Sequence, residues 1–137
     1  MKIHLLLLPV LLLCGGATYS QQTLEWPALS ASGTISTAFA ERSIPEYATR
    51  YVGQWVKIRG YVLALQPESG SYFLSAYPSA GCFFCGRANW DSVIELQFAQ
   101  PKGVSYKMDQ IVTLQGIFQL THDPYGPAYR LEQVIGR

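Results

Sequence analysis

Residues 54–65 read QWVKIRGYVLAL, and this stretch decides the fold class. Apolar side chains take every second position, at Val56, Ile58 and Val62, and charged or aromatic residues stand between them. A period of two is typical of a β-strand with one face in a core. Gly60, in the middle of the strand, predicts a bulge or a sharp bend of the kind that a barrel needs.

Further strands are expected wherever the same alternation returns between turn residues. Pro67-Glu68-Ser69-Gly70 is a strong turn and predicts a hairpin with the next strand. Five strands without a long helix indicate an all-β fold with one short N-terminal helix, and they suit a five-stranded OB-like barrel. A small β-sandwich is the alternative, because alternation does not reveal strand order. The four further predicted strands are 71–77, 92–99, 110–120 and 129–135.

The barrel domain is expected to span residues 43–137, preceded by an extended segment, 21–42, that has no clear period. A short helix is predicted from Ile44 to about Tyr51. Ser43 would cap it, Pro45 would stand in its first turn, and Gly53 would end it.

Residues 1–20 have the order of a secretory signal peptide: a basic start, an apolar run over 5–13 and then small residues. Ordinary cleavage would follow Ala17 or Ser20. In the alternative, cleavage before Cys14 leaves that cysteine lipidated. The sequence therefore predicts a periplasmic or secreted protein, with a lipid-anchored envelope protein as the alternative.

Charge excludes one class of partner. The chain has 10 Lys+Arg against 9 Asp+Glu, and loss of Lys2 with the leader leaves 9 against 9. A neutral chain without a basic run lacks the electrostatic surface that nucleic acid needs. It also offers no polybasic run for anionic lipid, so membrane contact is expected only through a lipidated Cys14.

Several stretches together carry a family resemblance: 60–65, 72–75 and 82–86, with Trp26, Leu29, Gly53, Val56, Val112, Leu114 and Gly116. In these the chain resembles the DUF3299 group, a family of uncharacterised exported bacterial proteins. The resemblance implies an OB-like fold in the cell envelope, company with metal-transport systems, and no established activity. One departure is that positions 83–84 read Phe-Phe where the family pattern has Pro-Phe.

Cys82 and Cys85 form a Cys-x-x-Cys motif with three interpretations. They are a structural disulfide in an oxidising compartment, half of a Zn or Cu site, or a thiol–disulfide redox pair. The redox interpretation lacks the βαβ setting of thioredoxin-like proteins. The metal interpretation needs more ligands, and His122 with Asp123, in the loop before the last strand, are the candidates.

Phe83 and Phe84 are adjacent in a loop, where both cannot easily be buried, so one is a candidate anchor for a partner protein, with Arg87 at its polar rim. No catalytic motif is present. We therefore expect a non-enzymatic envelope binding or accessory module, which handles metal ions through the Cys-x-x-Cys loop beside an envelope protein or metal-transport component. A protein–protein adaptor with a structural disulfide is the first alternative, and a thiol oxidoreductase is the second.

Overall fold

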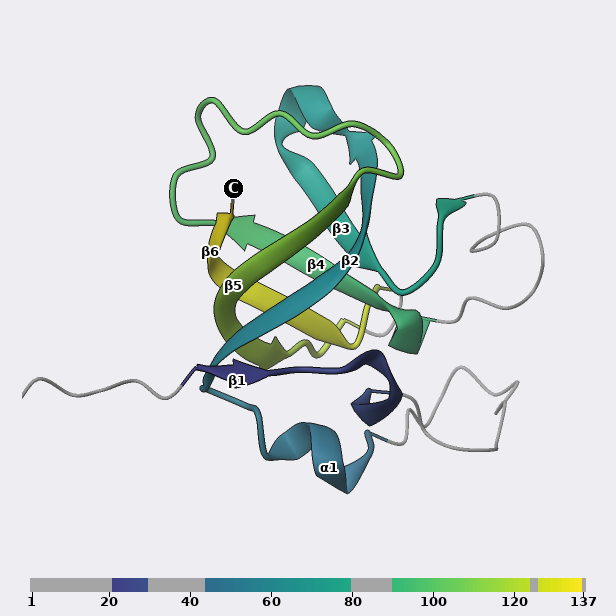
Figure 1. Cartoon of the computed structure of the whole chain (residues 1–137), viewed down its shortest axis with the longest axis vertical. Helices are drawn as coiled ribbons and strands as arrows, with labels where there is room; N and C mark the ends of the chain where they lie inside the picture. The colour runs from purple at the N-terminus through teal and green to yellow at the C-terminus, as the bar shows by residue number, and fades with distance from the viewer. Residues whose placement is uncertain (1–20, 30–43, 80–89, 124–125, 137) are drawn as a thin grey trace, which may run out of the picture.

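The structure is a computed structural model that describes residues 21–29, 44–79, 90–123 and 126–136 (Figure 1). Strands are the main regular structure of the described residues, whose single α-helix is short. The elements in chain order are β1 (Gln22–Thr23), η1 (Trp26–Ala28), α1 (Glu46–Thr49), β2 (Trp55–Gln66), η2 (Pro67–Ser69), β3 (Ser71–Ser75), η3 (Trp90–Ser92), β4 (Val93–Phe98), β5 (Ile111–Leu120) and β6 (Tyr129–Gly136).

The strands close into a barrel. Neighbours run in the order β2, β3, β4, β6 and β5, and β5 pairs back onto β2. All these pairs are antiparallel except β4 with β6, which is parallel, and β1 adds a short parallel pairing to β2. This closed five-stranded arrangement is the predicted OB-like barrel. The sandwich alternative is wrong, because the pairing of β2 with β5 leaves a single closed sheet.

The long strand β2 closes the barrel because it serves two partners in turn. It pairs with β5 from Trp55 to Tyr61 and with β3 from Tyr61 onward. The register stays regular through Gly60, so the predicted bulge is not there; it lies further on, between Ala64 and Gln66. Gly60 is needed for a different reason, since a Cβ at that position would lie only 2.6 Å from the carbonyl oxygen of Ser75.

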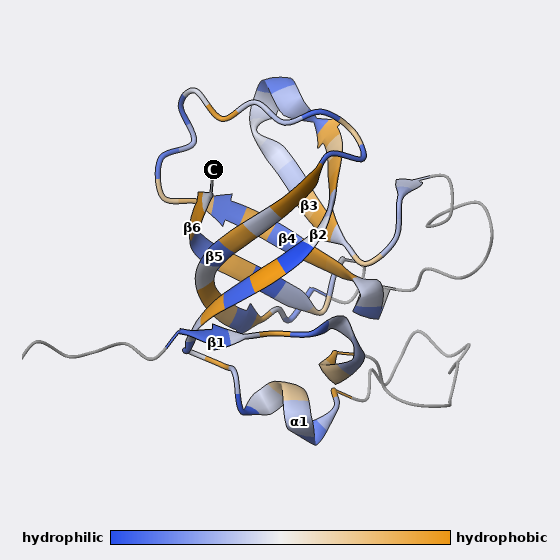
Figure 2. Cartoon of the chain, in the orientation of Figure 1, coloured by the Kyte–Doolittle hydropathy of each residue, from blue (hydrophilic) through white to orange (hydrophobic). Residues whose placement is uncertain are grey.

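The barrel interior is the main core. The inward side chains of the five barrel strands are apolar and mostly buried, as the alternation predicts, and Figure 2 shows the resulting stripes along β2. At one end of the barrel Tyr72, Phe98 and Tyr106 pack as an aromatic cluster with ring centroids 5.9–6.0 Å apart. Tyr106 comes from the connection between β4 and β5, which covers this end.

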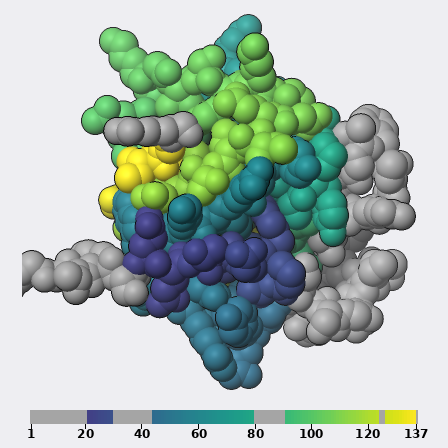
Figure 3. All heavy atoms as spheres, in the orientation of Figure 1, coloured from purple at the N-terminus to yellow at the C-terminus, as the bar shows by residue number. Residues whose placement is uncertain are grey.

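The other end of the barrel is covered by residues 21–29, here called the N-terminal strap. The strap crosses between the barrel and α1 (Figure 3) and buries Leu24 and Leu29. It is fixed by the indole Nε1 of Trp26, which donates to the Arg59 carbonyl at 2.7 Å, and by the Tyr129 hydroxyl, which donates to the Leu29 carbonyl at 2.9 Å. The segment predicted as extended is thus a packed part of the domain over its described residues.

Helix α1 is shorter than predicted. Pro45 occupies the N-cap position, and the regular part ends at Thr49. The predicted cap residue, Ser43, lies outside the described residues. A turn continues to Gly53, whose φ of +76° ends the segment as expected. Ala48 and Tyr51 are buried against the barrel, which is why tertiary packing can hold a helix of one turn.

Candidate functional site

Two connections emerge at the same end of the barrel, the one that the strap covers. Strands β4 and β6 are parallel, with Ile94 opposite Tyr129, so both begin at that end. The connection from β3 to β4 therefore leaves the barrel beside the connection from β5 to β6. The base of the first is closed by a hydrogen bond of 3.0 Å from the Ala76 amide to the Ser92 carbonyl.

The residues predicted for metal binding divide between these two connections. His122 and Asp123 are exposed at the start of the β5–β6 connection. Over the described ranges, no group of three or more His, Cys, Asp or Glu side chains is arranged to hold a metal ion. The other predicted site residues lie outside the described residues: Cys14, Cys82, Phe83, Phe84, Cys85 and Arg87.

Asp109 binds Ser79 in the part of the β3–β4 connection that follows β3. Its two carboxylate oxygens accept hydrogen bonds from the backbone amide and the hydroxyl of Ser79, both at 2.6 Å. Asp109 has a φ of +61°, in the left-handed region that non-glycine residues seldom adopt. This contact was not predicted from the sequence, although Asp is one of the residue types that tolerate such a backbone.

A cleft lies on the outer face of the barrel at this end, with a cavity of about 200 Å³. Its floor is apolar: Leu63 and Val93 are 1% and 2% exposed and form a cluster outside the main core, against which Phe73 packs. One wall is the β5–β6 connection, and Leu65, 54% exposed, stands at the opposite side. The lining residues are Leu63, Leu65, Phe73, Val93, Glu95, Asp123, Gly126 and Pro127.

Strand register explains how these residues meet. Leu63 lies opposite Phe73, Phe73 opposite Glu95, and Glu95 opposite Arg130, so one outward row crosses β2, β3, β4 and β6. The bulge after Ala64 interrupts the pairing beside Leu65, and bulges commonly redirect side chains near functional sites. The cleft was not predicted from the sequence, because only the inward-facing rows were considered. The available signal was two leucines, Leu63 and Leu65, at outward-facing positions of β2.

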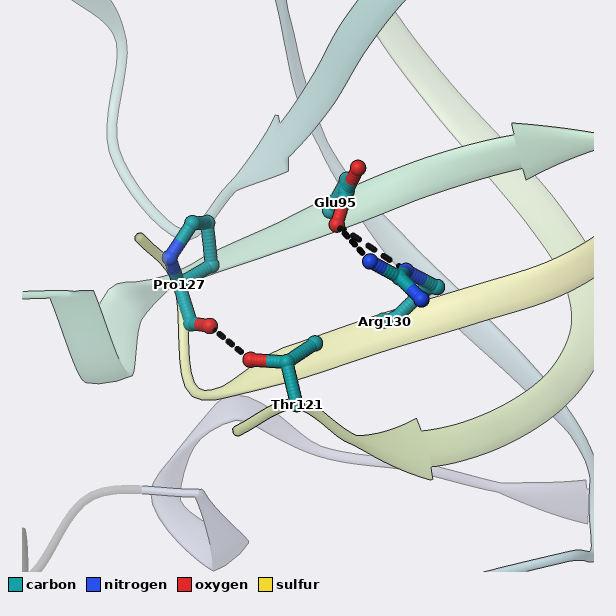
Figure 4. A network of polar contacts seen from close by, with 4 residues as sticks. All are labelled: Glu95, Thr121, Pro127 and Arg130. Atoms are coloured by element: carbon teal, nitrogen blue, oxygen red, sulfur yellow. Dashed lines mark hydrogen bonds and ion pairs between the residues drawn. The ribbon is translucent and has the colours of Figure 1, made fainter. Parts of the chain in front are cut away.

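An ion pair borders the cleft. Arg130 donates from Nε at 2.9 Å and from Nη2 at 2.8 Å, and both bonds end on the same oxygen, Oε2 of Glu95 (Figure 4). The two side chains are 37% and 38% exposed, so neither is desolvated. The neighbouring wall is fixed by the hydroxyl of Thr121, which donates to the Pro127 carbonyl and so closes the β5–β6 connection (Figure 4).

Among the described residues, three tyrosines have raised pKa values, and none of them lines the cleft. Burial raises the pKa of Tyr129, with a smaller contribution from the Asp91 carboxylate, and burial also raises that of Tyr106. For Tyr51 the hydrogen bond with Tyr47 is the main cause of the raised pKa. The raised pKa values of these three phenols thus follow from burial and from hydrogen bonding within the fold.

A second, wider hollow of about 470 Å³ lies on the outer face of β2, β5 and β6, bounded by Lys57, Thr113, Gln115, Ile135 and Gly136. Three of these five residues have polar side chains, and none of the five is a buried apolar residue, so the hollow has no buried apolar floor. Of the two hollows, the first cleft has a buried apolar floor, and it is therefore the better candidate for a binding site.

In the described ranges no helix is long and apolar enough to span a membrane.

Comparison with known proteins supports the fold. No protein-family model and no curated protein matches the sequence. Among solved structures, the chain is similar to a DUF3299 family protein from Pseudomonas aeruginosa, with a TM-score of 0.53 and 19% identity over 86% of this chain and 97% of that one. The neighbour thus comes from the family that the sequence resembles, and at this identity the likeness establishes a shared fold.

Proposed function

We propose that this protein is a non-enzymatic binding module of the cell envelope and that the cleft is its binding site. The observation that carries the proposal is the apolar cluster of Leu63, Phe73 and Val93, which lies outside the barrel core and faces a cavity. Apolar surface beside a cavity favours an apolar ligand group. In OB-type barrels the outer face of the second and third barrel strands, which are β3 and β4 here, commonly takes ligands.

The test is the binding of a neutral apolar dye, N-phenyl-1-naphthylamine, followed by its fluorescence. Leu65→Asn should weaken binding about fivefold, since it removes roughly 1 kcal/mol of apolar contact. Ile135→Asn is the matched control: it is 49% exposed against 54% for Leu65, and it borders the second hollow. Equal binding by both variants, or a loss only in Ile135→Asn, would refute the cleft as the site.

Metal handling through Cys82 and Cys85 is the second candidate function. It is favoured by strand order, since the connection that contains both cysteines leaves the barrel beside the connection that contains His122 and Asp123. Two thiolates with an imidazole are ligands that Zn²⁺ and Cu⁺ accept.

Titration of the reduced protein with Zn²⁺ and with Cu⁺ tests this second candidate. One equivalent should bind, and Cys82→Ser should abolish binding. His122→Ala should weaken it, while Glu95→Gln, a change in an acidic residue outside the two connections, should leave it unchanged. Binding no stronger than that of a Cys82→Ser, Cys85→Ser double variant would reject a metal site.

A further inference from the structure

We propose, resting on the binding module above, that the occupant of the cleft is an extended segment of a partner protein. One large apolar side chain of that segment enters the cavity, and the ion pair between Glu95 and Arg130 holds its main chain. The proposal rests on the size of the cavity, on the unused hydrogen-bonding groups of the ion pair, and on the spacing between the cavity and the ion pair.

Cavity size favours a side chain over a free small molecule. Pockets for small ligands and cofactors usually have about 300–1,000 Å³, whereas this cavity has about 200 Å³. Protein interfaces commonly place one large apolar residue in a well-packed pocket, surrounded by a polar rim. Here Glu95 and Arg130 form such a rim beside the apolar floor.

Each of the two residues of the ion pair keeps one hydrogen-bonding group unused. Both hydrogen bonds of Arg130 end on Oε2 of Glu95, and within the described part of the chain neither Glu95 Oε1 nor Arg130 Nη1 has a hydrogen-bond partner. The pair therefore keeps an acceptor on Glu95 and a donor on Arg130, on different sides of the bonded oxygen (Figure 4). Both are complementary to an extended main chain, because the N–H of one peptide unit would donate to Glu95 and the carbonyl of another would accept from Arg130.

The spacing allows both contacts at once. Phe73, Glu95 and Arg130 lie opposite one another on three adjacent strands, and adjacent strands are about 4.8 Å apart. An extended chain advances about 3.4 Å per residue. A segment with its apolar side chain above Phe73 therefore brings a peptide unit over the ion pair within one or two residues.

The test selects binders from a phage-displayed library of random 12-residue peptides with the whole protein as the target. Enriched peptides should share one large apolar residue. Arg130→Met should weaken the binding of the selected peptides about tenfold, the effect of losing one charged hydrogen bond. Lys102→Met, an equal change of charge in the β4–β5 connection, should not weaken it. Methylation of the main-chain nitrogen of the peptide at the apolar residue or its neighbour should weaken binding by a similar factor.

Two outcomes would overturn this inference: selected peptides without a shared apolar residue, or peptides that bind Arg130→Met as tightly as the wild type. Dye binding separates this failure from failure of the binding site itself. If the dye requires Leu65 while peptides ignore Arg130, the cleft binds apolar ligands but not a peptide main chain. If the dye ignores Leu65 as well, the cleft is not a binding site.

Discussion

Gly60→Ala should loosen the barrel at the point where β2 changes partners. The added Cβ would lie 2.6 Å from the Ser75 carbonyl oxygen, 2.9 Å from Cγ of Leu74 and 3.0 Å from Cζ2 of Trp26. Ordinary contacts begin at 3.4 Å, so β3 would have to move by 3.4 − 2.6 = 0.8 Å. The obstructing oxygen belongs to the backbone of a paired strand, and it cannot rotate away as a side chain can.

The expected loss of stability is about 1 kcal/mol. Overpacking costs roughly 1–3 kcal/mol, and the better strand propensity of Ala returns about 0.5–1 kcal/mol. For a domain of this size the melting temperature should fall by about 5 °C. Because the shift also separates Leu63 from Phe73, the floor of the cleft should open and dye binding should weaken.

Urea denaturation followed by circular dichroism measures this effect. Arg59→Ala is the control on the same strand, since its exposed side chain should change stability by less than about 0.5 kcal/mol. A Gly60→Ala variant as stable as the wild type would refute the close approach of β2 and β3 and, with it, the reason for a glycine at this position.

Three further outcomes are expected. Tyr129 has a raised pKa, so in the folded protein its phenol keeps the proton that the unfolded chain releases near pH 10. The free energy of unfolding should therefore fall as the pH rises above 10. In alkaline melts, Tyr129→Phe should reduce the slope of this fall. Asp109→Ala should lower the free energy of unfolding by about 2–3 kcal/mol, because it removes both hydrogen bonds to Ser79 and leaves a Cβ at positive φ. In urea titrations, Asp109→Gly should be more stable than Asp109→Ala by about 1 kcal/mol. Arg130→Met should change stability by less than about 1 kcal/mol, because its partner Glu95 is half exposed; a larger loss in thermal melts would mean that the pair is structural.

Strand content and the inward rows follow from local sequence. In β2 the period of two places Val56, Ile58 and Val62 inward because successive side chains of a strand point to opposite faces, and all three are buried. The helix was harder to predict. Its one turn begins after Pro45 and is held by the packing of Ala48 against the barrel, and such packing leaves no local signal.

The sequence by itself determined the β-rich class, the position of each of the five barrel strands and the resemblance to DUF3299 proteins, because alternation and turn residues act over a few neighbours. Only the tertiary structure decided that β2 pairs with both β3 and β5 and so closes a barrel. The same closure brings Leu63, Val93 and Pro127 around one cavity. Contacts between residues that far apart in the chain depend on strand order and register, which hydrophobic periodicity does not encode.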